Sequence, residues 1–319
     1  MISATRLQRA VRPAARAFSS SASPSRILVT GGTGQIGMEL VPYMRQLFGA
    51  DTIVNSDIKA PVVATDRDSM ARIVTEQGVD TIVHMASLLS AVGEANPSLA
   101  LSVNTRGIQN VLELAKQYQL RVFAPSTIAV FGPSTPQEDT PDTTIMRPTT
   151  MYGLTKVHVE LLGEYYYNKF GVDFRSVRYP GVISSEALPG GARQVHVFLN
   201  PDAKLPMMYM PDCLKATLGL INAPNDCLSQ RTYNITAVSF TPEEIVASIQ
   251  KVMPSFQCDY KPDFRQQIAE TWPRSIDDSI ARRDWNWQHD FDLDSMVEDM
   301  LVKLDAKLSK PEAVVEETA

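Results

Sequence analysis

The stretch MYGLTK, residues 151–156, contains a tyrosine and a lysine four residues apart where a helical pattern opens. On a helix, side chains at this spacing are neighbours, which raises the question of whether Tyr152 is a general base. A free tyrosine has a pKa near 10, and a nearby ammonium would lower it by stabilising the phenolate. The spacing is also ordinary, because a tyrosine ring often packs on a lysine stem. The pair therefore indicates a catalytic site only if the chain also supplies a cofactor and a third group.

A cofactor site is predicted in LVTGGTGQIGMEL, between the first predicted strand and the first helix. Gly31 would allow a tight turn, Gly34 the close approach of a pyrophosphate, and Gly37 the close packing of helix on strand. The N-terminus of the helix would offer free amide donors to the phosphates. Three glycines alone are weak evidence, but the strand before them and the helix after them are the context that a dinucleotide site requires.

The acid at the end of the second predicted strand distinguishes between the two common dinucleotides. Asp57 follows Gly37 by 20 residues, where an acid accepts hydrogen bonds from an adenosine ribose. A carboxylate at this point repels a 2′-phosphate, so the sequence favours NAD over NADP. The alternative is that Asp57 is a solvated turn residue before Lys59.

Two hydroxyl side chains, Ser126 and Thr127, stand at the end of the fourth predicted strand in APSTIAVFG. The carboxyl ends of neighbouring parallel strands surround one crevice. Hydroxyls at this point would therefore face a nicotinamide bound across that crevice, and they are the candidates for the third group.

The elements that must position these groups alternate between β-branched runs and amphipathic helical stretches, the order that builds a parallel sheet. The expected fold class is α/β, a Rossmann-type doubly wound parallel sheet with a smaller C-terminal substrate-binding lobe. Strands are predicted at 26–30, 52–57, 80–85, 121–125 and 173–179, and helices at 34–48, 67–77, 97–118 and 152–169. An NAD-binding domain is expected over 26–180 and the lobe over 181–308, where Thr241 to Glu244 predict a helix start with a capping box.

Composition excludes several classes of protein. The chain has 319 residues, 44% hydrophobic and 21% charged, with a net charge of −6, which argues against nucleic acid as a partner. No apolar run approaches the roughly 20 residues of a membrane-spanning helix. The three cysteines and four histidines show no metal-ligand spacing, so no metal site is predicted.

The first 25 residues differ from the rest of the chain, with four arginines, clustered serines and no acid. This composition is typical of a mitochondrial transit peptide, so residues 1–25 predict a location in the matrix. The alternative is an untargeted, disordered basic tail. Residues 309–319 are expected to form a second disordered tail.

Taken together, TGGTGQIG, PSTIAVFG and YGLTK resemble the extended short-chain dehydrogenase/reductase superfamily, which also contains the nucleotide-sugar epimerases. More narrowly, SLLSAVGEANP, LNPDAKLPMMYMPDC and TWP are similar to segments of its NAD-dependent L-threonine 3-dehydrogenases. The resemblance extends from about residue 26 to about residue 300. It implies oxidation of L-threonine to 2-amino-3-oxobutanoate, with hydride passing from Cβ to NAD.

The resemblance also implies roles for individual residues. Tyr152 would take the substrate's hydroxyl proton, Lys156 would lower the pKa of Tyr152 and hold the nicotinamide ribose, and Thr127, helped by Ser126, would orient the hydroxyl. Ser90 and Trp272 would line the substrate pocket, although Ser90 could equally cap a turn and Trp272 could anchor a core. Further cofactor contacts are expected from Gln35, Ile36, Ile58, Asp66, Met85, Ala86, Ser87, Asn104, Tyr179 and Val182.

One segment departs from the pattern of this family. Over residues 190–198 the chain has no room for a helix found in the family's enzymes, and the threonines that would contact substrate are missing. The departure removes one wall of the pocket, where positioning of the substrate supplies much catalytic power. Two alternatives therefore stand beside the dehydrogenase: a nucleotide-sugar epimerase, and an NAD-binding protein with impaired catalysis. A homodimer is expected through the long helices at 97–118 and 152–169.

Overall fold

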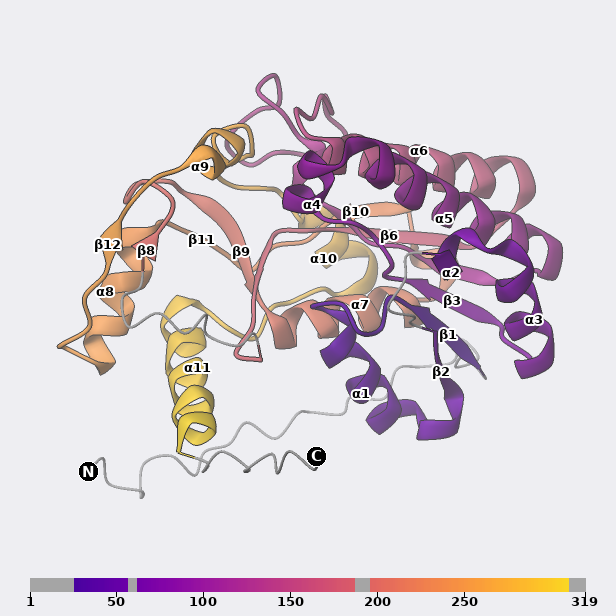
Figure 1. The fold of residues 1–319 in the computed structure, drawn as a ribbon, viewed down its shortest axis with the longest axis horizontal. Helices are drawn as coiled ribbons and strands as arrows, with labels where there is room; N and C mark the ends of the chain where they lie inside the picture. The colour runs from indigo at the N-terminus through magenta and orange to yellow at the C-terminus, as the bar shows by residue number, and fades with distance from the viewer. Residues whose placement is uncertain (1–25, 57–61, 187–195, 310–319) are drawn as a thin grey trace, which may run out of the picture.

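The computed structural model describes residues 26–56, 62–186 and 196–309. In these ranges a parallel sheet lies between two layers of helices, and a smaller sheet stands to one side of it (Figure 1). The expected α/β fold with a doubly wound parallel sheet is confirmed.

The main sheet has seven strands in the order β10-β6-β4-β3-β1-β2, with β5 paired to β6. Every neighbouring pair is parallel. The strands are β1 (Ile27–Thr30), β2 (Ile53–Ser56), β3 (Thr81–His84), β4 (Arg121–Phe123), β5 (Ser126–Thr127), β6 (Phe174–Tyr179) and β10 (Thr232–Asn234). The predicted strands are confirmed, each within two residues at either end.

Helices cover both faces of this sheet (Figure 1). On one face are α3 (Arg67–Gln77), α5 (Pro97–Tyr118) and α6 (Met151–Phe170), with the short α2 (Val62–Thr65) and α4 (Ser90–Ala95) beside them. On the other are α1 (Gly37–Phe48), α7 (Met210–Asn222) and α10 (Ser279–Trp285). In β1, Leu28 faces the first layer while Ile27 and Val29 face the second, so three successive residues of the strand are apolar.

The predicted helix at 34–48 begins three residues later than expected, at Gly37. Residues 34–36 belong to the turn instead, where the amide of Gly34 donates to the carbonyl of Gly31 at 3.1 Å. The ranges predicted for the helices at 67–77 and 97–118 match α3 and α5.

The smaller sheet lies in the C-terminal part of the chain and has the order β11-β9-β7. Tyr209 and Phe240 from this sheet share a core with Met296 and Val297 of the last helix. The predicted capping box is present, with Thr241 and Glu244 bonding each other's backbone amides. The helices and strands of this C-terminal part, inside and outside the smaller sheet, are β7 (Gly181–Ile183), β8 (His196–Val197), β9 (Leu205–Tyr209), β11 (Val238–Phe240), α8 (Pro242–Val252), β12 (Asp259–Tyr260), α9 (Phe264–Ala269) and α11 (Leu293–Leu308).

The sequence assigned everything beyond residue 180 to the lobe, but part of that stretch completes the main sheet. Strand β10 pairs with β6, and α7 and α10 cover the second face. Strand β6 would otherwise be an exposed edge, so residues 210–236 and 279–285 supply its partner strand and the cover of its second face. No helix in the described ranges is long and apolar enough to cross a membrane.

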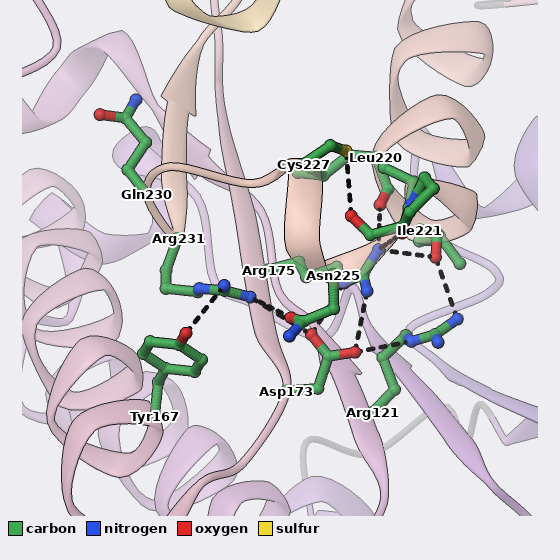
Figure 2. A network of polar contacts seen from close by, with 12 residues as sticks. Arg121, Tyr167, Asp173, Arg175, Leu220, Ile221, Asn225, Cys227, Gln230 and Arg231 are labelled. Carbon is green, nitrogen blue, oxygen red and sulfur yellow. Dashed lines mark hydrogen bonds and ion pairs between the residues drawn. The ribbon is translucent and has the colours of Figure 1, made fainter. Parts of the chain in front are cut away.

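A cluster of arginines holds the C-terminal end of α7 at the amino end of β6 (Figure 2). Arg175 donates to the carbonyls of Leu220, Ile221 and Ala223, which an α-helix leaves unpaired at its end. Its Nε and Nη2 atoms bond Asp173 at 2.8 and 2.9 Å. The same carboxylate also pairs with Arg121 at 2.9 Å and Arg231 at 3.6 Å.

Candidate active site

The glycine turn between β1 and α1 is packed too closely for side chains at two of its positions. Gly31 has φ +75°, and a Cβ there would lie 2.5 Å from the backbone nitrogen of Ala86. At Gly37 a Cβ would lie 2.3 Å from the carbonyl oxygen of Gly31. At Gly31 the turn therefore lies directly against the chain that follows β3, and at Gly37 the start of α1 packs directly on the turn.

Gly34 faces outward instead. It is exposed, and a Cβ built on it would meet only the Gly31 carbonyl, at 3.2 Å. No side chain caps the N-terminus of α1 after Ile36, although the amide of Met38 in its first turn donates to the Gly34 carbonyl at 2.9 Å. Close by in sequence to Ala86, the Ser87 hydroxyl is buried without a hydrogen-bond partner. An outward backbone, an uncapped helix end and an unpaired hydroxyl suit a phosphate-containing ligand.

The remaining predicted contacts to the adenosine are placed only in part. Asp57 and Ile58 lie outside the described residues. The side chain of Asp66 is the N-cap of α3, where it accepts from the amides of Asp68 and Ser69. Met85 continues from β3, with its amide donating to the Thr30 carbonyl at 2.9 Å.

The start of α6 is pressed against the segment that follows β5. Thr150 caps the helix by accepting from the amide of Gly153. A Cβ on Gly153 would lie 2.1 Å from the carbonyl oxygen of Ala129, in the short 3-10 turn Ile128–Val130. This contact brings Tyr152, in the first turn of α6, to Thr127 at the end of β5.

Thr127, Tyr152 and Lys156 therefore come together as their spacing predicted. The hydroxyl of Thr127 lies near enough to that of Tyr152 to oppose the rise in its pKa. The Lys156 Nζ atom lies 5.7 Å from the centroid of the Tyr152 ring and donates to the Pro125 carbonyl at 2.8 Å. A phenol, an alcohol and an amine thus share one site, at the carboxyl end of the sheet.

Burial controls the protonation of both ionisable groups. It raises the pKa of Tyr152 to about 12, with the Thr127 hydroxyl acting in the opposite direction. It lowers the pKa of Lys156 to about 8, opposed by the charge of Glu160. Desolvation of the phenol outweighs any help from the lysine, so the net pKa of Tyr152 is raised, and a lowering contribution from Lys156 stays a prediction.

Asn104, on α5, joins two parts of the site. Its side-chain oxygen accepts from the Leu88 amide at 2.8 Å, and its amide group donates to the Leu88 carbonyl at 3.1 Å and to the Thr155 hydroxyl at 3.0 Å. The loop that follows Ser87 is thereby tied to the residue before Lys156. Direct contact of Asn104 with a cofactor remains a prediction.

Ser126 is placed differently from its neighbour Thr127. It is buried, and its hydroxyl donates a short hydrogen bond to Glu160. Glu160 in turn forms a buried ion pair with Arg178, with 2.8 Å between the closest atoms. Ser126 therefore faces this ion pair, whereas the sequence expected it to help orient a substrate hydroxyl.

Sequence reasoning missed three acidic or basic groups around the site. Glu94, on α4, accepts from the amide of Met151 at 2.7 Å, immediately before Tyr152. Glu160 could have been found, because it follows Lys156 by one helical turn on the same side of the helix. Arg178 gave a weaker signal, a charged residue within an otherwise buried strand.

Four further residues predicted for the site differ in their burial and in the groups that they contact. Tyr179 is buried, and its hydroxyl bonds that of Thr217 on α7. Val182 is half-buried in β7, and Ser90 begins α4. Trp272 packs on the apolar cluster around Ile128 and also lines a cavity of about 440 Å³. That cavity is bordered by charged side chains of both signs, namely Asp202, Lys204, Glu270 and Arg274.

A family model described as the NAD dependent epimerase/dehydratase family matches residues 27–236, about two thirds of the chain. The chain belongs to this family. Its cofactor is NAD, and the outward Gly34, the uncapped α1 and the unpaired Ser87 hydroxyl fit a dinucleotide at the glycine turn.

Relatives within the family carry more specific names. The mitochondrial L-threonine 3-dehydrogenase of Sus scrofa is 47% identical over 310 residues, covering 88% of this chain and 83% of that protein. The crystal structure of L-threonine dehydrogenase from Phytophthora infestans is 88% identical with a TM-score of 0.86, covering 89% of this chain and all of that one (100%). A monomeric L-threonine 3-dehydrogenase from a metagenome database, in its apo form, is 41% identical with a TM-score of 0.84. The match covers 89% of this chain and 100% of that one.

Proposed function

We propose that this protein is an NAD-dependent L-threonine 3-dehydrogenase, which oxidises L-threonine to 2-amino-3-oxobutanoate. The observation that carries the proposal is the meeting of Thr127, Tyr152 and Lys156 at the carboxyl end of the sheet, in a chain 88% identical to an enzyme named for this substrate. The reaction takes a hydride from Cβ and a proton from its hydroxyl, so it needs a hydride acceptor and a base.

In this proposal the protein's own groups handle the proton and the orientation of the substrate. Tyr152, as phenolate, accepts the proton of the Cβ hydroxyl, and Thr127 hydrogen-bonds the same oxygen to hold it in place. Lys156 stabilises the phenolate by its charge and binds the ribose next to the nicotinamide. Bound NAD supplies the hydride acceptor.

The cofactor is proposed to lie along the carboxyl end of the sheet. Gly31, Gly34, Gly37 and the N-terminus of α1 would hold the pyrophosphate, while Asp57 would hold the adenosine ribose. Ser90 and Trp272 are the proposed substrate contacts. Residues 26–180 are proposed to bind the cofactor and residues 181–308 to bind the substrate, although β10, within the second range, belongs to the main sheet. The shortened segment 190–198 lies mostly outside the described residues.

A mitochondrial location is proposed from the composition of residues 1–25, which lie outside the described residues, and from the name of the porcine relative. Import of a fusion of residues 1–25 to a fluorescent protein tests it. A fusion that stays in the cytosol would contradict the proposal.

A homodimer is proposed through α5 and α6. Leu154, Leu161 and Tyr165 are each about half exposed and form one stripe along α6, at the i, i+7, i+11 spacing of a helix face. Light scattering on the purified protein tests this, with Leu161→Glu expected to yield monomers. A monomeric parent, like the monomeric relative, would contradict it.

The test of the activity is the appearance of NADH when the purified protein is mixed with NAD and L-threonine. Tyr152→Phe should lower kcat by about 10²–10⁴-fold, the usual contribution of a general base. Tyr118→Phe, which removes a hydroxyl at the far end of α5, is the matched control and should keep parental activity. Activity that survives Tyr152→Phe contradicts the mechanism. NAD binding without oxidation of L-threonine favours the impaired-catalysis alternative, and turnover of a nucleotide sugar favours the epimerase.

A further inference from the structure

Behind the proposed catalytic residues lies a second polar group, formed by Ser126, Glu160 and Arg178. Each member adjoins a proposed site residue in the chain. Ser126 precedes Thr127 on β5, Arg178 precedes Tyr179 on β6, and Glu160 follows Lys156 by one turn of α6. A shift of any one of them would therefore be transmitted to the site.

The group is almost completely enclosed, with exposed fractions of 1% for Ser126, 1% for Glu160 and 4% for Arg178. The carboxylate of Glu160 accepts from the Ser126 hydroxyl and from Nε and Nη2 of Arg178, at 2.9 and 2.8 Å for the last two. Buried charges that are paired and fully hydrogen-bonded hold a single geometry. Glu160 is therefore a fixed acceptor for Ser126.

Arg178 is itself fixed from the other side. Its Nη1 atom donates to the Asp142 carbonyl at 2.7 Å and to the side-chain oxygen of Asn234 at 3.1 Å. Its guanidinium also lies 5.3 Å from the centroid of the Phe131 ring. The arginine thus joins α6 to β10 and to the loop that contains Asp142.

Strand β5 depends on this group because it is only two residues long. Its ladder consists of Ser126 opposite Arg178 and Thr127 opposite Tyr179. The bond from Ser126 to Glu160 adds an attachment to α6, the helix that contains Tyr152 and Lys156. This attachment ties β5 to that helix in addition to the close contact of Gly153 with Ala129.

Glu160 also acts on Lys156 by its charge. The other titratable groups that face this lysine are Tyr152 on the same helix and His84 on β3. Burial and the lysine itself lower the pKa of His84 to about 3, so that imidazole is neutral and adds no charge at working pH. Glu160 is therefore the nearby carboxylate that favours the ammonium form of Lys156.

We propose that Glu160, clamped by Arg178, is a positioning residue that fixes Thr127 through Ser126 and holds the Lys156 side chain as an ammonium. The inference rests on the proposed function of Thr127, Tyr152 and Lys156. It assigns Ser126 to the support of the site and not to the substrate.

Ser126→Ala, Glu160→Gln and the double variant test the positioning role. Each single change should lower kcat by about 10-fold with KM for L-threonine changed less than about 2-fold, because the substrate contacts remain. The double variant should be no slower than the slower single variant, since both changes break one connection. Multiplying effects, or a KM increase in Ser126→Ala, would mean that Ser126 contacts the substrate directly and would overturn the proposal.

The charge of Glu160 is tested by NADH affinity, followed by cofactor fluorescence from about pH 6 to about pH 10. Loss of the carboxylate makes the neutral amine of Lys156 easier to form, so the pH at which NADH affinity declines should be lower in Glu160→Gln than in the parent. Ser126→Ala keeps the charge of Glu160, so its NADH affinity should decline at the same pH as that of the parent. A decline at the same pH in all three proteins contradicts the charge role.

Asp173→Asn is the matched control, because it weakens the other arginine–carboxylate pair of β6, at the opposite end of the strand from the site. It should lower the melting temperature while kcat and the pH dependence stay parental. If Glu160→Gln fails to fold, Ser126→Ala still decides the positioning role. If the parent does not oxidise L-threonine, the proposed function fails by itself, and the NADH titration still tests the effect of Glu160 on Lys156.

Discussion

Strand β6 contains two buried arginines three residues apart, and they serve opposite ends and opposite faces of the sheet. Arg178, near the carboxyl end, faces α6 and pairs with Glu160 beside the proposed active site. Arg175, near the amino end, faces α7 and pairs with Asp173 (Figure 2). Both are paired guanidinium groups in a strand without exposed residues.

Their surroundings differ in how much water they admit. The Glu160 side chain is 1% exposed, whereas that of Asp173 is 25% exposed and is shared among three arginines. Loss of one partner at the carboxyl end leaves the other charge buried without its ion-pair partner. At the amino end the remaining arginines and water compensate. The rigid pair, Arg178 with Glu160, therefore lies where catalytic groups need placement. The tolerant pair, Arg175 with Asp173, lies where a helix end needs hydrogen bonds.

The largest expected effect is that of Arg178→Met. It leaves Glu160 buried without its ion-pair partner, which should cost about 3–5 kcal/mol in the free energy of unfolding, measured in urea. Adding Glu160→Leu should recover much of that stability, because an apolar pair can replace a buried ion pair. Activity should not recover, since Ser126 still lacks its acceptor. A double variant with parental kcat would show that the pair of Glu160 and Arg178 is not needed for activity.

Arg175→Met should have an intermediate effect, about 2–3 kcal/mol, because the carbonyls at the end of α7 lose their buried donor. The Ile221 carbonyl keeps a bond from Arg121, and Asp173 keeps two other arginines. Urea unfolding gives the stability, and NADH production should show an unchanged kcat for the folded fraction. A large loss of kcat would show that the two ends of β6 are not independent.

The smallest expected effect is that of Asp142→Asn. Burial raises the pKa of Asp142 to about 6, above its usual 3.8, so the folded state binds a proton that the unfolded state releases between these values. This carboxyl therefore adds stability as pH falls from about 6 to about 4 and costs stability above that window. The Asp142→Asn variant should have a free energy of unfolding roughly 1 kcal/mol higher than the parent at neutral pH and equal to it near pH 4. Unfolding measured at both pH values tests this. An equal gain at both would point to packing and not to charge.

The sequence predicted most of the main sheet because its signals are local. Apolar runs at β1, β3 and β4, and helical periodicity at α3 and α5, need no knowledge of distant contacts. Thr127, Tyr152 and Lys156 were found for a similar reason, since a strand end and a helix start converge in this type of fold. The sequence did not predict β10 as a strand, and its residues were included in the expected lobe. Three residues have no pattern of their own, and only their pairing with β6 defines them.

The pKa of Tyr152 and the partner of Ser126 could not be predicted for a related reason. Both depend on burial and on Glu160, which reach the site from other elements. The sequence shows that Lys156 is near Tyr152, but it does not show how much water the fold removes from each. Spacing therefore predicts which groups meet, and packing determines their charge.

Asn104 shows how little substitution such a site tolerates. One oxygen accepts from the Leu88 amide while one nitrogen donates to the Leu88 carbonyl and the Thr155 hydroxyl. A carboxylate of the same size has no hydrogens for the two acceptors, and glutamine is longer by one methylene group. In a library of all side chains at this position, selected for turnover, asparagine alone should survive.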